Sequence, residues 1–159
     1  MPKTMNEICT IGYENATLQG VITALKEAGV ALLVDIRDAP VSRKPGFSKR
    51  TFGATLESEG IRYLHLKALG TPKPGRDAAK RGDRETFHAI YQKQFESADA
   101  RAAFADLLTI ASAERACLLC YEQDHARCHR DIVADAMAAR GFSVRHLTSL
   151  PAWMTGEGA

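Results

Sequence analysis

The sequence predicts an α/β fold, a three-layer α/β/α sandwich around a mainly parallel, five-stranded sheet of Rossmann-like type. Short apolar runs of strand length alternate with stretches of helical periodicity. Parallel strands need crossover connections, and these connections cover both faces of the sheet. With 159 residues and 45% hydrophobic content, the chain is long enough to bury one core. We therefore expect a single α/β domain over residues 1–150 and a flexible C-terminal tail over residues 151–159.

Five apolar runs have the length and composition of buried strands, and each is bounded by polar or glycine-containing segments. The runs cover residues 8–12, 31–37, 62–66, 116–121 and 144–147. All five are too short for helices of a globular domain, which favours strands.

Helical patterns fill the intervals between these runs. Thr17 is a suitable N-cap for a first helix that ends at Gly29, and Ser48 opens a second helix that ends at Gly60. Three further helices are indicated by apolar residues at helical spacing. Their stripes are Phe87, Ile90, Tyr91 and Phe95; Ala103, Phe104, Leu107, Leu108 and Ala111; and Ile132, Ala136 and Ala139.

The connection between the third and fourth strands contains two of these helices, whereas the earlier connections contain one each. Such a long return suits a chain that crosses to the far side of strand one, so the predicted strand order is 3-2-1-4-5. The same connection includes a stretch without apolar periodicity, from Gly70 to Arg84. Connections of that length are usually functional or unstructured, and we expect a lid or a disordered loop.

Ligands of doubly wound sheets bind outside the carboxyl ends of the strands, where the winding direction reverses. In the predicted order that point lies between strands one and four, which places residues 12–14 opposite residues 120–122. The segment LLCYEQDHARCHRD, from Leu118 to Asp131, supplies the densest group of reactive side chains. Strand two ends at the same edge, in VDIRDAPVSRKPGF. The catalytic candidates are Glu122, Asp35 and Cys120, and the substrate-binding candidates are Gly12, Tyr13, Glu14, Arg37, Ser42, Arg43, His129 and Arg130.

The net charge of +2 hides an uneven distribution of basic residues. Two groups stand out, one over residues 37–50 and one over residues 73–84, and together they favour an anionic partner, either a small molecule or a nucleic acid. The chain has no apolar stretch long enough for a membrane span. Its four cysteines lack the dense spacing of a disulfide framework, so we expect a cytoplasmic protein in a reducing compartment.

Four motifs of the chain resemble those of the domain of unknown function 488 family. They are TIGYE near the start, VDIR followed by DAPVSRKPGF, IRYLHLKALG, and the C-x-E and CHR elements of CYEQDHARCHR. The similarity covers nearly the whole chain, from Cys9 to about Leu147. It implies a compact α/β domain with an unassigned activity.

The first functional hypothesis is an enzyme that acts on a phosphate-bearing substrate, such as a nucleotide or a nucleic acid. Arg37, Arg43 and Arg130 would clamp the anion, and Glu122 or Asp35 would serve as acid and base. Asp35 with Arg37, or Glu122 with Arg130, could equally be structural ion pairs at the strand ends. No Walker loop, dinucleotide-binding glycine motif or G-x-S-x-G elbow is present.

Two alternatives remain open. The chain could be a thiol or sulfur-transfer enzyme in which Cys120 attacks and Cys128 resolves, although either cysteine could instead be a small core residue. It could also be a non-catalytic nucleic-acid-binding protein that uses its basic groups. Adjacent residues of a helix point about 100° apart, so Cys128 and His129 are not expected to share an ion, and we predict neither a metal nor a cofactor.

Overall fold

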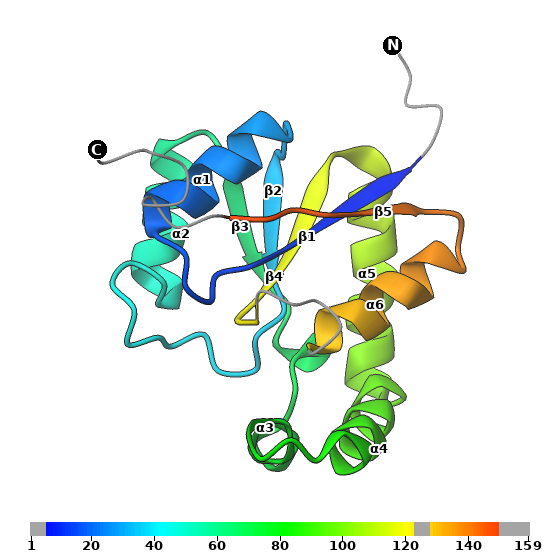
Figure 1. The fold of residues 1–159 in the computed structure, drawn as a ribbon. Helices are drawn as coiled ribbons and strands as arrows, with labels where there is room; N and C mark the ends of the chain where they lie inside the picture. Colours follow the sequence, from blue (N-terminus) through cyan, green and yellow to red (C-terminus); the bar gives the residue numbers. More distant parts are fainter. Residues whose placement is uncertain (1–5, 123–127, 150–159) are drawn as a thin grey trace.

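The computed structural model describes residues 6–122 and 128–149. Its five strands are β1 (Glu7–Gly12), β2 (Leu32–Asp35), β3 (Arg62–His65), β4 (Ala116–Cys120) and β5 (Ser143–His146). Its helices are α1 (Leu18–Glu27), α2 (Lys49–Ser58), the short 3-10 helix η1 (Lys67–Leu69), α3 (Lys73–Lys80), α4 (Arg84–Phe95), α5 (Ala98–Ala113) and α6 (His129–Ala138) (Figure 1). The five predicted strands and five predicted helices are all confirmed. The predicted flexible tail lies outside the described residues.

The sheet is parallel throughout, and its order is β3-β2-β4-β1-β5. The predicted order 3-2-1-4-5 is therefore wrong in its centre, because β4 lies between β2 and β1 and not beyond β1. The connection from β1 to β2 skips one position in the sheet, and the long return from β3 places β4 in that position. Strands β1 and β4 are nevertheless neighbours, as predicted, and Gly12 pairs with Cys120.

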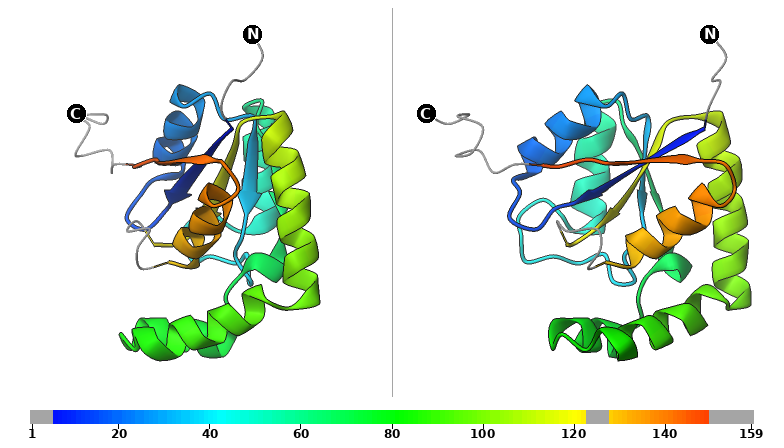
Figure 2. Two further views of the ribbon diagram at one scale, coloured as in Figure 1. Left: turned by 90° about the vertical axis from the view of Figure 1, so that its right-hand side faces the viewer. Right: turned by 45° about the vertical axis from the view of Figure 1, so that its right-hand side comes forward.

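The helices cover both faces of the sheet, which makes three layers (Figure 2). Helices α1 and α2 pack on one face, where they bury Val21, Leu25 and Phe52 against alternate strand residues such as Leu33. Helices α4, α5 and α6 bury their apolar side chains in the cluster on the other face. The crossovers therefore leave β1 and β4 toward opposite faces, and the winding direction reverses between these two neighbours.

The segment from Gly70 to Arg84 is not a disordered loop, whereas a role as a lid stays a prediction. Most of it forms α3, which begins with a proline in its first turn and buries Gly75 and Ala78 against α4. Helices α3 and α4 extend beyond the carboxyl edge of the sheet (Figures 1 and 2). The helix was missed because its sequence, KPGRDAAK, has too few apolar residues to show a stripe.

Side-chain caps fix the start of several helices. The Thr17 hydroxyl accepts from the Gly20 amide at 2.9 Å, as predicted. Ser48 precedes α2 but makes no such cap, because its hydroxyl bonds to the backbone of Ser42. No helix within the described part of the chain combines the length and the apolar character needed to cross a membrane.

Candidate thiol site at the carboxyl edge of the sheet

The site begins where β1 and β4 end side by side. Beyond the paired residues Gly12 and Cys120, the Glu14 amide donates to the Tyr121 carbonyl at 2.8 Å. A Cβ atom at Gly12 would lie 1.8 Å from the Glu122 carbonyl oxygen and 2.6 Å from Nη1 of Arg130. Glycine is therefore required here, because any side chain would displace the backbone of Glu122.

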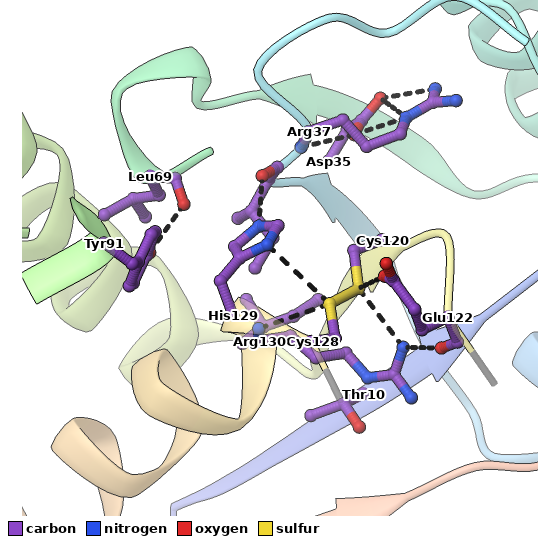
Figure 3. Close-up of a disulfide and its surroundings, with 12 residues drawn as sticks. Thr10, Asp35, Arg37, Leu69, Tyr91, Cys120, Glu122, Cys128, His129 and Arg130 are labelled. Atoms are coloured by element: carbon purple, nitrogen blue, oxygen red, sulfur yellow. Dashed lines mark hydrogen bonds and ion pairs between the residues drawn. A yellow bond between two sulfur atoms is a disulfide. The ribbon is translucent and has the colours of Figure 1, made fainter. Parts of the chain in front are cut away.

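Helix α6 brings a second cysteine to this edge. Cys128 is the N-cap of α6, and its sulfur is joined to that of Cys120 in a disulfide (Figure 3). Both residues are almost fully buried, at 2% and 3% exposure. The Arg130 amide approaches the Cys128 Sγ at 3.5 Å, as an N-cap requires. The two cysteines that were open to either a thiol or a core role are thus a bonded pair.

The other two cysteines lie elsewhere in the core. Cys9 and Cys117 are buried and carry free thiols, and they are neighbours in the register of β1 and β4. Burial raises the pKa of both thiols, which makes them poor nucleophiles. Both cysteines are core residues.

His129 is held by hydrogen bonding and burial. Its Nε2 lies 2.7 Å from the Ile36 carbonyl oxygen, so Nε2 carries the proton and Nδ1 carries the lone pair. That lone pair lies 3.7 Å from the Cys128 Sγ (Figure 3). Burial lowers the pKa of His129 to about 4, although the hydrogen bond to Ile36 acts in the opposite direction. The imidazole is therefore neutral at physiological pH.

Tyr91 supports the histidine from α4. Its ring lies 5.2 Å from that of His129, and its hydroxyl donates to the Leu69 carbonyl at 2.7 Å. The desolvation of this buried phenol raises its pKa above the ordinary value. Tyr91 therefore acts as a neutral packing residue that connects α4, η1 and α6.

Arg130, which the sequence analysis assigned to an anion clamp, is completely buried. Its Nη1 donates to the Glu122 carbonyl at 2.5 Å and lies 3.3 Å from the Cys120 Sγ. The Glu122 carboxylate lies 3.7 Å from the same sulfur. Cys120 thus lies between a cation, which stabilises negative charge on the sulfur, and a carboxylate, which opposes it.

Asp35 and Arg37 form a buried ion pair at the end of β2. The Arg37 Nε and Nη2 donate to the Asp35 carboxylate at 2.9 and 2.7 Å, while Nη1 donates to the Tyr13 hydroxyl and the Phe47 carbonyl. Burial alone would lower the pKa of Arg37, but its hydrogen bonds to Asp35 raise it above its ordinary value. All three nitrogens of this guanidinium are thus engaged within the protein.

Three aromatic rings complete this cluster. The Tyr63 hydroxyl donates to Asp35 at 2.5 Å. Burial and, after it, the charge of Asp35 raise the pKa of Tyr63. Tyr13 stacks on Phe47 with ring centroids 4.5 Å apart. Asp35, with four donors directed at it, is engaged like Arg37 in holding β2, β3 and the loop after β2 together.

A cavity of about 370 Å³ lies over the disulfide. Of the predicted site residues, Tyr13, Arg37, Cys120, Glu122 and His129 line it. The other predicted site residues do not line it; they are Gly12, Glu14, Asp35, Ser42, Arg43 and Arg130. The remaining lining comes from the loop after β2, from α3 with the residue Thr71 before it, from α4, and from the residues that follow β4 and precede α6. It consists of Asp38, Ala39, Val41, Thr71, Arg76, Ala79, Lys80, Phe87, Tyr121 and Cys128.

Sequence reasoning did not identify the polar rim of this cavity. Arg76 donates to the Asp38 carboxylate at 2.6 Å, and Lys67 contacts the same group at 3.2 Å. Although partial burial opposes it, hydrogen bonding to these two cations lowers the pKa of Asp38. Arg76 belongs to a basic group that the sequence did reveal, but only the missed helix α3 shows where it points.

The helical-spacing argument against an ion shared by Cys128 and His129 does not hold. Cys128 has extended backbone angles, φ −129° and ψ 152°, because it is the N-cap and not a helical residue. The 100° separation of helical neighbours therefore does not apply to Cys128 and His129. The sulfurs of Cys120 and Cys128 and a ring nitrogen of His129 all lie within 4.8 Å of one another.

Comparison with known proteins identifies a family whose description names no activity. The model of a family described as "Domain of unknown function DUF488" matches residues 17–137. No curated protein and no solved structure matches the chain.

Proposed function

The chain belongs to the DUF488 family, whose description leaves its activity open, and from the geometry of the cysteine pair we propose that it is a thiol enzyme of the thiol–disulfide exchange class. One observation carries this proposal: Cys120 and Cys128 are within bonding distance on the wall of a cavity, beside a buried guanidinium and a helix N-terminus. Positive charge of both kinds stabilises thiolates.

Cys120 is the attacking residue in this proposal, because Arg130 contacts its sulfur directly. In the dithiol form, the Cys120 thiolate attacks one sulfur of a substrate disulfide R–S–S–R′. A mixed disulfide Cys120–S–S–R forms, and R′–S⁻ leaves and takes up a proton. The resulting thiol R′–SH departs through the cavity.

Cys128 completes the reaction. Its sulfur lies 3.7 Å from Nδ1 of His129, so in the dithiol form the Cys128 thiol can direct its proton at the Nδ1 lone pair. As the Cys128 sulfur attacks Cys120, this proton passes by way of His129 to the departing R–S⁻. The balance is dithiol plus R–S–S–R′ giving protein disulfide plus R–SH plus R′–SH, so two electrons and two protons pass to the substrate.

The phosphate-substrate hypothesis has less support from the geometry. Arg37 is engaged with Asp35, Arg130 is fully buried, and Arg43 is exposed outside the cavity. Arg76 and Lys80 line the cavity instead, so an anionic group on the disulfide substrate remains compatible with the site. Phosphate chemistry and nucleic-acid binding both stay predictions from the sequence.

Trapping of the mixed disulfide tests the proposal. Cys128→Ser leaves the attacking thiolate without its resolving partner, so a reduced Cys128→Ser protein incubated with oxidised glutathione should accumulate one glutathione on Cys120, located by mass spectrometry. Cys120→Ser should trap much less, and Cys9→Ala, which removes a buried free thiol, should exchange as the wild type does. Equal trapping in folded Cys120→Ser and Cys128→Ser would remove Cys120 from its assigned role, and no trapping in either would reject the function.

A further inference from the structure

We propose that the dithiol form of this site binds one borderline-soft divalent ion of the zinc type through the sulfurs of Cys120 and Cys128 and Nδ1 of His129. The inference rests on the proposed function only in so far as both use the reduced pair. It adds a second state of the site, in which the two thiolates hold a metal ion and do not exchange with disulfides.

The ligand set fits zinc chemically. Two thiolates and one neutral imidazole are the protein ligands of one well-known type of catalytic zinc site, in which a fourth position stays open. Here the imidazole already has the required tautomer, because Nε2 donates to the Ile36 carbonyl and Nδ1 carries the lone pair. Such a hydrogen bond from the distal nitrogen is the usual support of a metal-binding histidine.

The distances fit as well. Zinc bonds of about 2.3 Å to sulfur and 2.05 Å to nitrogen, at a tetrahedral angle, place the two ligand atoms about 3.6 Å apart. The Cys128 sulfur and His129 Nδ1 are 3.7 Å apart. The two cysteine Cα atoms are 7.3 Å apart, a spacing that leaves room for an ion between the reduced side chains.

The surroundings leave one side of the ion accessible. All three ligands line the cavity of about 370 Å³, so a fourth ligand, either water or a substrate group, would approach from there. Glu122 lines the same wall and places its carboxylate 3.7 Å from the Cys120 sulfur. A carboxylate beside the open position could accept a proton from a metal-bound water.

Metal binding and oxidation exclude each other at this site. Binding of zinc to the two thiols releases two protons. Oxidation by a disulfide R–S–S–R converts the zinc dithiolate, with two protons, into the protein disulfide, free Zn²⁺ and two R–SH molecules. An oxidant of the same class as the proposed substrate would thus release the ion.

Titration of zinc into tag-free protein tests this inference. With the wild type reduced by a phosphine, we expect one zinc per chain, bound tightly enough to compete with a chromogenic chelator, and cobalt should give a thiolate-to-metal charge-transfer band. His129→Gln keeps an amide donor for the Ile36 carbonyl but lacks Nδ1, and should bind zinc at least about 10- to 100-fold more weakly, because losing only the hydrogen-bond partner of a ligand already costs that much. Cys9→Ala is the matched control and should bind as the wild type does.

A second readout needs no variant. Zinc added to the reduced wild type should slow alkylation of Cys120 and Cys128 at least tenfold. Binding that persists in the oxidised protein, or failure of the reduced protein to bind zinc or to show this protection, would overturn the inference. The proposed function is scored separately by glutathione trapping on metal-free protein, so exchange without zinc binding rejects the metal site alone, and zinc binding without exchange rejects the exchange activity alone.

Discussion

Nη1 of Arg130 lies 3.3 Å from the sulfur of Cys120, and the arginine side chain is completely buried. A guanidinium excluded from water acts on a neighbouring sulfur through a lower effective dielectric than a surface cation does. This contact is the principal physical reason to assign the attacking role to Cys120, and Figure 3 shows how α6 directs the arginine back to the end of β4.

Removal of this charge should slow the reaction of Cys120. In reduced Arg130→Gln we expect alkylation of Cys120 by iodoacetamide at pH 7 to fall about tenfold or more, since hydrogen bonds to charged groups contribute roughly 1.5 to 3 kcal/mol. Arg140→Gln, an exposed residue in the turn after the same helix, should react as the wild type does. The rate is measured by peptide mass spectrometry. An unchanged rate in a folded Arg130→Gln protein, or a Cys120 that reacts only after unfolding, would contradict the assignment.

The close approach of Gly12 to the Glu122 carbonyl predicts that a side chain at Gly12 will destabilise the protein. Gly12→Ala places a Cβ 1.8 Å from the Glu122 carbonyl oxygen, so the end of β4 must shift, at a cost of about 3 kcal/mol or more. Gly53→Ala is the matched control, because its Cβ would meet only the Tyr63 ring at 3.4 Å and alanine favours the helix by up to about 1 kcal/mol. Urea denaturation measures both. Equal stabilities of the two variants would show that the strand ends are farther apart than described.

The pair of Asp35 and Arg37 should matter for folding more than for chemistry. Asp35→Asn leaves a buried guanidinium without its counter-charge, which should destabilise the protein by about 3 to 5 kcal/mol. Asp38→Asn removes a more exposed partner of Arg76 and Lys67 and should cost about 0 to 1 kcal/mol. Thermal unfolding followed by circular dichroism separates these cases. If Asp35→Asn keeps its stability but loses thiol exchange, Asp35 is part of the catalytic machinery.

Burial of neutral His129 predicts a pH dependence of stability. Its pKa of about 4 in the folded protein lies below the ordinary 6.5, so the unfolded chain binds this proton first as the pH falls. The contribution of neutral His129 to the free energy of unfolding is fully present above about pH 6.5. It is lost as the pH falls from 6.5 to 4, by at most about 1.4 kcal/mol per pH unit.

His129→Gln cannot titrate in this window and serves as the reference. The difference in free energy of unfolding between wild type and variant, measured on oxidised protein with a chelator present, should shift in favour of the variant as the pH falls from 6.5 to 4. A constant difference would mean that His129 is charged or solvated in the folded protein.

The sequence predicted most of the fold because its signals are local. Strand-length apolar runs and caps such as Thr17 identify five strands and five helices. Strand order, by contrast, depends on pairing between segments far apart in the sequence. Periodicity shows that the chain returns after β3, but not whether β4 pairs outside β1 or between β1 and β2. Helix α3 was missed because it has little apolar pattern of its own and is held in place by its contact with α4.

The sequence predicted where the site lies better than it predicted how the site residues contact one another. Cys120, Glu122, His129 and Arg130 were all selected because strand ends of a parallel sheet meet at one edge. Their relations depend on tertiary contacts without a sequence signal. The N-cap conformation of Cys128, for example, turns its sulfur toward Cys120 and permits it to share an ion with His129. Arg37 illustrates the converse, because a cation that looked available for an anion is engaged by Asp35.

The most direct test of the central claim is the redox equilibrium of the cysteine pair. Metal-free protein is equilibrated in glutathione buffers of defined ratio, quenched by acid and alkylated, and the labels on all four cysteines are counted by mass spectrometry. The proposal predicts one two-electron transition that involves only Cys120 and Cys128, at a potential in the range of roughly −120 to −270 mV that is typical of exchange enzymes. Cys9 and Cys117 should remain thiols throughout. A pair that stays oxidised below about −300 mV would be a structural disulfide, and a pair that never forms a disulfide in oxidised glutathione would have no exchange chemistry; either result would contradict the proposed function.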